Sequence, residues 1–200
     1  MYPASSGLWP TLKGRMTTYM VDRMQIAANE VPRLRESYFR QYGTTLRGLQ
    51  AHHNIDVEDY LAYVHDVRLA EYLHPDTTQQ EVLAALPTRN FIFTNADARH
   101  AGRVLRELGI DGYFIDIIDV NRMAPYCKPS QQAFELALAV SGEQQPEKCV
   151  MVDDLPHTTQ AARQFGMFAV LFGAQEHSGK ADVACLDWSA LPAALGSARS

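Results

Sequence analysis

Three short polar segments of the sequence carry side chains that could act on an anion or a metal ion. Thr94 and Asn95 offer a hydroxyl group, an amide group and backbone N–H groups, all of which can bind an anion. Lys128 carries an ammonium group that can hold a phosphate group or neutralise a nearby carboxylate. Asp153 and Asp154 are adjacent carboxylates, whose oxygen atoms can hold a hard divalent cation.

Each of these segments also has an ordinary structural explanation. A Thr-Asn pair at the end of a strand often caps a turn, and a lysine before a proline is usually a solvated surface residue. An Asp-Asp pair can cap the N-terminus of a helix. The argument for a site is the combination, because each polar segment follows an expected strand. The carboxyl ends of parallel strands meet at one edge of a sheet, where ligands bind.

Apolar runs separated by amphipathic stretches predict alternating strands and helices from residue 86 onward. The continuously apolar run at 149–152 is typical of a strand buried in a parallel sheet. Repeated β-α-β units imply right-handed crossovers, so the expected fold class is α/β: a Rossmann-like parallel sheet with helices on both faces. Strands are expected at 91–93, 113–119, 149–152, 167–173 and 182–188. Helices are expected at 97–109, at 130–142 with Ser130 as the candidate cap, and at 158–166, with a helical turn at 189–196.

The sequence before residue 86 has a different pattern, with no convincing strand between residues 16 and 82. Apolar residues recur at helical spacing in "TTYMVDRMQIAANE", and "VPRLRESYFRQYG" has a proline near its start and a glycine at its end. "TTLRGLQAHH" and "DVEDYLAYVHDV" predict two more helices, the second with Asp56 as its N-cap. We therefore expect a linker at 1–15, an inserted all-helical cap at 16–85 and an α/β core at 86–200.

The composition narrows the classes of partner. A net charge of -5 gives no basic surface for nucleic acid or an anionic membrane, although a small site can still be locally positive. No apolar run approaches the length of a membrane span, and no signal pattern is visible. Three cysteines without CxxC spacing favour free thiols in a reducing compartment, so we interpret the protein as cytoplasmic. The oligomeric state is left open.

The polar segments, taken in order, resemble the haloacid dehalogenase superfamily of phosphohydrolases, and most closely its pyrimidine 5'-nucleotidase branch. "FTNAD", "CKPS" and "VMVDDLPHTTQAARQFGM" are similar to the second, third and fourth motifs of that family, and "MYPASSGLWP" and "YGTTLRGL" resemble the linker and cap of the branch. The resemblance implies that Thr94, Asn95 and Lys128 bind a phosphate group and that Lys128 is catalytic. It also implies that Asp154, and second to it Asp153, holds Mg²⁺.

Two departures from the family pattern are visible. Thr158 stands four residues after Asp154, where the family usually has Asp or Asn. The sequence also contains no DxDxT motif, and Met1 stands where the residue after that motif is expected, so the first strand and its nucleophilic aspartate are missing. The resemblance places that strand between the strands that end at Asn95 and Asp154, and its loss leaves a gap of roughly 10 Å. The neighbouring strands could close up, another segment could fill the gap, or the natural chain is longer.

Three hypotheses follow. The first is a Mg²⁺-dependent phosphomonoesterase for a small phosphorylated substrate, most plausibly a nucleotide, in a chain that lacks the attacking aspartate and is therefore expected to be weakly active or inactive. The second is a non-catalytic protein that binds phosphate or a partner at the same site. The third is a structural module whose cap helices mediate oligomerisation.

Overall fold

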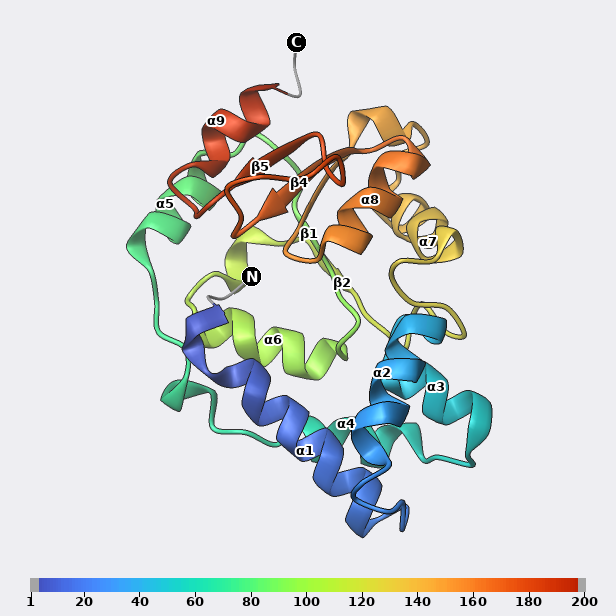
Figure 1. Ribbon diagram of the computed structural model, residues 1–200. Helices are drawn as coiled ribbons and strands as arrows, with labels where there is room; N and C mark the ends of the chain where they lie inside the picture. Colours follow the sequence, from blue (N-terminus) through green and yellow to red (C-terminus); the bar gives the residue numbers. More distant parts are fainter. Residues whose placement is uncertain (1–3, 198–200) are drawn as a thin grey trace.

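The structure, a computed structural model, describes residues 4–197 and begins with a helical region (Figure 1). Among the described residues before Phe91 there is no strand. Helix α1 begins in the range expected for a linker, eight residues before the range expected for the cap. The elements are η1 (Ala4–Ser6), α1 (Leu8–Asp22), α2 (Val31–Tyr42), α3 (Thr45–His52), α4 (Val57–His65), η2 (Leu69–Glu71) and α5 (Thr77–Ala85).

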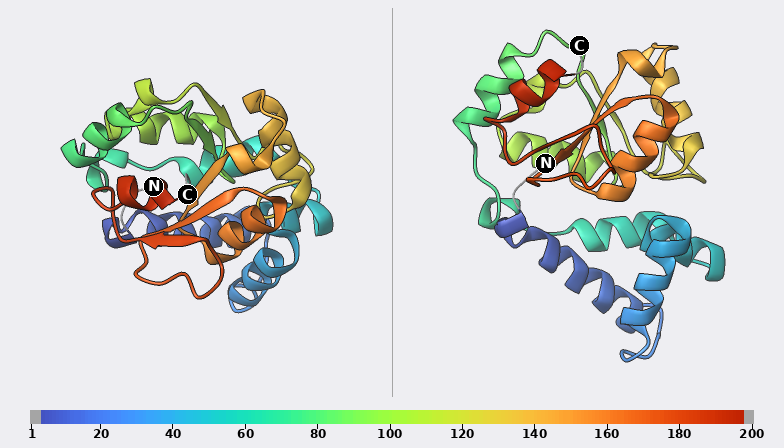
Figure 2. Two further views of the ribbon diagram at one scale, coloured as in Figure 1. Left: turned by 90° about the horizontal axis from the view of Figure 1, so that it is seen from above. Right: turned by 45° about the horizontal axis from the view of Figure 1, so that its top comes forward.

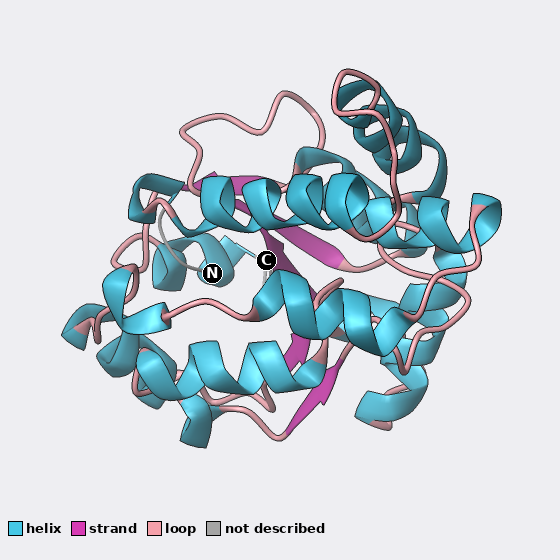
Figure 3. Cartoon of the chain, turned by 90° about the horizontal axis from the view of Figure 1, so that it is seen from below, coloured by secondary structure: helices cyan, strands magenta, loops and turns pink. Residues whose placement is uncertain are grey.

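The rest of the chain alternates between strands and helices, which confirms the expected α/β fold class. Every strand pair is parallel. Helices lie on both sides of the strands (Figure 3), with α8 packed against β3 and β4 and α6 against β2. The elements are β1 (Phe91–Phe93), α6 (Ala98–Glu107), η3 (Asp111–Tyr113), β2 (Asp116–Ile118), α7 (Gln131–Ser141), η4 (Pro146–Lys148), β3 (Val150–Asp153), α8 (Pro156–Phe165), β4 (Phe168–Phe172), β5 (Val183–Cys185) and α9 (Leu191–Gly196).

The strands form two separate sheets rather than one. Strand β1 pairs with β2, whereas β3, β4 and β5 form a second sheet in that order. Each of β1 and β3 therefore has one edge without a strand partner among the described residues. The expectation that residues 149–152 form a buried strand is wrong for Val150, which is 41% exposed. The physical reason is that side chains alternate between the two faces of a strand: Met151 and Asp153 of β3 are buried, whereas the face of Val150 is incompletely covered.

Short-range capping signals account for many of the element boundaries. The side chains of Asp56 and Ser130 accept hydrogen bonds from backbone N–H groups of Asp59 and Ala133, which confirms the predicted N-cap of α4 and the Ser130 cap of α7. The helix predicted from "TTYMVDRMQIAANE" is shorter than expected, since α1 ends at Asp22. Gln25, with a φ of 58°, adopts a left-handed conformation that a helix cannot contain.

Helices α1 to α4 lie on one side of the α/β region (Figure 2) and share its largest hydrophobic core, whereas α5 lies beside α9 (Figure 1). Fully buried side chains of α1, α2 and α4 belong to the same cluster as Leu105 of α6 and Val120, which follows β2. A separate cluster around Phe134 joins α7 and α8 to β3 and β4. The helices are thus fastened by apolar burial to the β1–β2 half of the α/β region. In residues 4–197 we find no helix with the length and apolar character needed to cross a membrane.

Candidate functional site

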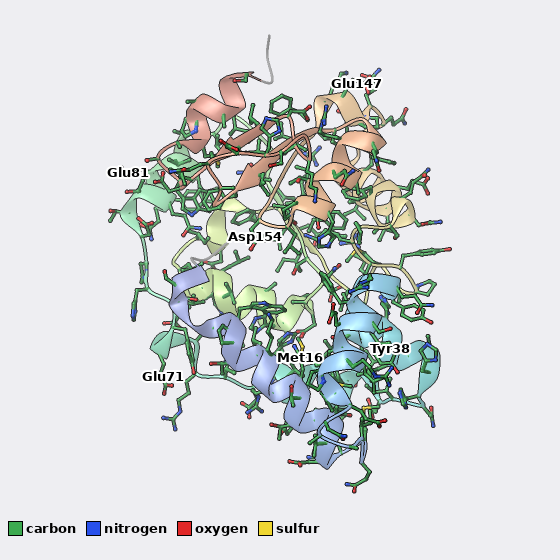
Figure 4. The ribbon with its side chains drawn as sticks, viewed as in Figure 1. Met16, Tyr38, Glu71, Glu81, Glu147 and Asp154 are labelled. Carbon is green, nitrogen blue, oxygen red and sulfur yellow. The ribbon has the colours of Figure 1, made fainter. Side chains whose placement is uncertain are left out.

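The predicted polar residues lie at the carboxyl ends of three parallel strands. Thr94 and Asn95 follow β1, Lys128 comes after β2, and Asp153 is the last residue of β3. The neighbouring Asp154 lies between the strands and helix α1 in the view of Figure 4. Because parallel strands point in the same direction, their carboxyl ends meet at the edge that faces the helical region.

Lys128 and Asp153 form a buried ion pair. The Lys128 Nζ atom lies 2.6 Å from Asp153 Oδ2, and the two residues are only 8% and 5% exposed. The other carboxylate oxygen of Asp153 accepts a hydrogen bond of 2.9 Å from the backbone N–H of Leu155. The ammonium group also lies 5.2 Å from the centre of the Phe93 ring. This pair joins the segment after β2 to β3, and therefore connects the two sheets.

Asn95 holds the backbone of Lys128 in place. Its Nδ2 atom donates to the carbonyl oxygen of Lys128, and its Oδ1 atom accepts from the N–H of Lys128, both at 2.9 Å. The Asn95 side chain is thus committed to the protein, and its contribution to a site is to position the lysine. The sequence had suggested instead that this amide could contact an anion directly.

Thr94 combines a structural role with a free donor. Its backbone N–H donates to the carbonyl of Ile118 at 2.9 Å, and its Oγ1 atom accepts from the N–H of Ala96 at 3.0 Å. The second contact is the turn capping that was the ordinary explanation for a Thr-Asn pair. A hydroxyl that accepts one bond still has its own hydrogen to donate, so Thr94 can also bind an anion.

The two aspartates differ in what they offer to a metal ion. Asp154 is exposed, whereas Asp153 is buried beside Lys128. Within residues 4–197, no group of three or more His, Cys, Asp and Glu side chains could hold a metal ion. Mg²⁺ is nevertheless commonly bound by one or two carboxylates, with water and substrate phosphate completing its coordination. The two carboxylates fit such an open Mg²⁺ site, but they do not surround the ion by themselves.

Thr158, which departs from the family pattern, lies on helix α8, four residues after Asp154. It is 1% exposed, and its Oγ1 atom has no hydrogen-bond partner among the described residues. A buried hydroxyl without a partner is uncommon, because desolvation of the group is not compensated. Thr158 therefore retains an unused polar atom at the position where the family usually has Asp or Asn.

A groove of about 910 Å³ runs between the helical region and the segment that contains Lys128. The backbone approach here is close: a Cβ atom at Gly43, where φ is +80°, would lie 2.8 Å from the Lys128 carbonyl oxygen. Part of the stretch "YGTTLRG", which resembles the cap of the family branch, lines the groove. The lining includes Phe39, Tyr42, Gly43, Arg47, Cys127 and His157.

Arg47 is a contributor that the sequence interpretation did not single out. It is 7% exposed, and its guanidinium group donates to the carbonyl oxygens of Val120 and Tyr126. Burial lowers the pKa of Arg47. Through these bonds α3 holds both ends of the segment between β2 and Lys128. The available signal was an arginine close to two leucines in the stretch "TTLRGLQ".

Comparison with known proteins identifies a matching family and a yeast relative. A family model described as haloacid dehalogenase-like hydrolase matches residues 4–166. "Phosphate metabolism protein 8" of Saccharomyces cerevisiae is 28% identical over 185 residues, covering 86% of this chain. The chain spans only 58% of the length of that yeast protein.

Solved structures show the same fold at low sequence identity. An HAD phosphatase from Thermococcus onnurineus matches with a TM-score of 0.63 and 18% identity, covering 96% of this chain and 91% of that one. The HAD-hydrolase YfnB from Bacillus subtilis, in a magnesium-bound form, matches with a TM-score of 0.63 and 11% identity, covering 94% and 92%. The family match over residues 4–166 shows that this chain belongs to the haloacid dehalogenase-like hydrolase family.

Proposed function

We propose that this chain carries the phosphate-binding side of a Mg²⁺-dependent phosphomonoester hydrolase, with a nucleotide 5'-phosphate as its substrate. The observation that supports this most directly is the buried Lys128–Asp153 pair at the strand ends of an HAD-family fold. Within this proposal the chain belongs to the pyrimidine 5'-nucleotidase branch and acts in the cytoplasm. Residues 16–85 act as a helical cap, residues 1–15 lead into it, and residues 86–200 form the catalytic core.

The proposed roles follow from charge and hydrogen bonding. A phosphate ester carries up to two negative charges, which the ammonium group of Lys128 would partly offset while the Thr94 hydroxyl donates a hydrogen bond. Asn95 keeps the lysine backbone in place through its two 2.9 Å hydrogen bonds. Asp154 and Asp153 would hold Mg²⁺, which offsets further phosphate charge when bound.

The attacking carboxylate is proposed to come from a strand that is not among residues 1–200. The sequence contains no pair of aspartates in DxD spacing, and Asp153 is already paired with Lys128 and proposed as a metal ligand. Covalent phosphoryl transfer needs a carboxylate about 3–3.5 Å from phosphorus. The edges of β1 and β3 that lack strand partners among the described residues support a position for such a strand between the two sheets.

A second candidate function is non-catalytic binding of phosphate or of a phosphorylated partner. The observation that favours it is that both Asp153 oxygens already accept hydrogen bonds, from Lys128 Nζ and from the Leu155 N–H, so this carboxylate is not free to attack phosphorus. A cradle of this kind can hold an anion without any chemical step.

Hydrolysis assays separate the two functions. Phosphate release from nucleoside monophosphates with Mg²⁺ should be weak or absent for residues 1–200. It should appear when an apolar strand ending in Asp-x-Asp-x-Thr precedes Met1, and be lost when the first added aspartate becomes asparagine. Phosphate binding without turnover in both chains would favour the non-catalytic function.

Robust turnover by residues 1–200, abolished by a chelator, would instead show that the nucleophile lies within this sequence.

Asp154→Asn tests the metal role without disturbing the core, because Asp154 is exposed. We expect this variant to bind Mg²⁺ at least about tenfold more weakly by calorimetry.

A further inference from the structure

A second buried polar cluster lies outside the proposed phosphate site and consists of His65, Asp97 and His100. These residues are 8%, 9% and 4% exposed, respectively. Asp97 Oδ2 contacts His65 Nδ1, and Asp97 Oδ1 accepts from the backbone N–H of His100 at 2.8 Å. The two imidazole rings are stacked, with their centres 4.0 Å apart and their planes 15° from parallel.

The cluster connects three parts of the molecule. His65 is the last residue of α4 in the helical region, while Asp97 is the N-cap of α6 in the α/β region. Only Ala96 separates Asp97 from Asn95, the residue that holds the Lys128 backbone. Movement of Asp97 would therefore be transmitted to the loop that carries Thr94 and Asn95.

The surroundings of His100 disfavour a positive charge on its ring. Its Nδ1 atom is buried with no hydrogen-bond partner among the described residues. The charged groups that act on it are His65 from α4, Asp97 at the start of its own helix and Arg103 further along that helix. From the side of β2, Asp119 is occupied by hydrogen bonds from backbone N–H groups of α6 and of the turn after β2.

Electrostatics agrees with this geometry. Burial, followed by the neighbouring His65, lowers the pKa of His100 to about 3. Burial acts to raise the pKa of Asp97, but the hydrogen bonds from His65 and from the His100 N–H outweigh it and hold that pKa below its usual value. The folded cluster therefore keeps His100 neutral beside an ionised Asp97.

We propose that His65, Asp97 and His100 form a clamp that fastens helix α4 to the loop carrying Thr94 and Asn95, and that acid releases it because His100 takes up a proton only when the clamp is open. His65 and Asp97 are positioning residues in this scheme. That the loop binds phosphate rests on the proposed function. The clamp itself does not depend on that function.

The size and sign of the acid effect follow from linkage. An open clamp gives His100 a normal pKa near 6.5, so protonation stabilises the open state below that pH. The opening constant should rise about tenfold for each pH unit below 6.5, or about 30-fold between pH 8 and pH 5. Asp97 acts in the same direction only below pH 4, because its folded pKa is lowered from 3.8.

The test is hydrogen exchange of the His100 and Ala101 amides by NMR at pH 5 to 8, corrected for intrinsic exchange, with the amides of β4 as the reference for global unfolding. The wild-type chain should open about 30-fold more at pH 5 than at pH 8. His100→Phe keeps a ring against His65 but cannot take a proton, so its opening should not depend on pH. His53→Gln, which removes a histidine bonded to Tyr38 instead, is the matched control and should behave as the wild type.

Two outcomes would overturn the clamp: equal pH dependence in the wild type and in His100→Phe, or exchange at His100 no faster than in β4. Should His100→Phe fail to fold, His100→Gln gives the same comparison.

Inorganic phosphate at 100 times its dissociation constant should lower the opening constant about 100-fold if the loop binds phosphate. A pH-dependent clamp that phosphate leaves unchanged would retain this inference and reject the proposed phosphate site.

Discussion

Two ion pairs in the α/β region have the same N–O distance but very different surroundings. The Lys128–Asp153 pair and the Arg122–Asp116 pair both measure 2.6 Å. The side chains of the first pair are 10% and 7% exposed, and both side chains of the second are 42% exposed. The first lies between the two sheets at the carboxyl ends of the strands, whereas the second lies at the beginning of β2.

The difference shows that burial, rather than the N–O distance, decides how much stability is lost when an ion pair is broken. Charges near water interact weakly because the solvent screens them, and exposed pairs typically contribute about 0–1 kcal/mol. A buried charge that loses its partner keeps its desolvation cost, so breaking such a pair typically costs about 3–5 kcal/mol. The Lys128–Asp153 pair is therefore a structural requirement of the site as well as a source of positive charge.

The largest expected effect comes from breaking the buried pair on one side. Lys128→Met leaves the Asp153 carboxylate buried without its counter-charge, and should lower the free energy of unfolding by about 3–5 kcal/mol. Urea denaturation followed by circular dichroism measures the change. The double variant Lys128→Met/Asp153→Leu should be more stable than Lys128→Met alone, because no charge is left buried. A double variant that is less stable than either single variant would contradict this explanation.

An intermediate effect is expected at the N-cap of α6. Asp97→Ala removes the acceptor for the His100 N–H and leaves His65 without its partner, and should cost about 2–3 kcal/mol of unfolding free energy. Asp97→Asn keeps a capping oxygen and should cost about 1 kcal/mol. The pKa of Asp97 is lowered in the folded protein, so this stabilisation is present above pH 4 and is lost as the pH falls further. Equal losses of unfolding free energy in Asp97→Ala and Asp97→Asn would argue against a separate contribution from the capping hydrogen bond to the His100 N–H.

The smallest effect is expected at the exposed pair and tests the comparison most strictly. Arg122→Ala should change the free energy of unfolding by no more than about 0.5 kcal/mol, and less at high salt. Hydrogen bonds from the Arg122 guanidinium and the Ile117 N–H lower the pKa of Asp116. Any contribution of this pair to stability is therefore lost as the pH falls below the pKa of a normal aspartate. A loss comparable with that of Lys128→Met would show that distance matters more than burial.

Much of the α/β region could be predicted because its signals are local. Five apolar runs indicated the five strands, and Ser130 and Asp56 cap the helices that the sequence assigned to them. Helix ends were less predictable where backbone conformation rather than apolar spacing decides them, as at Gln25. The exposure of Val150 could not be predicted from its apolar run, because it depends on which face of the strand the rest of the fold covers.

The site shows the same division between local and long-range information. The sequence by itself determined that Thr94, Asn95, Lys128, Asp153 and Asp154 follow strands, and parallel pairing then placed them at one edge. Only the tertiary structure decided that Lys128 pairs with Asp153, 25 residues away, and that His65 contacts Asp97, 32 residues away. Contacts at such separations depend on how whole helices and sheets pack against one another, which no local pattern of residue types encodes.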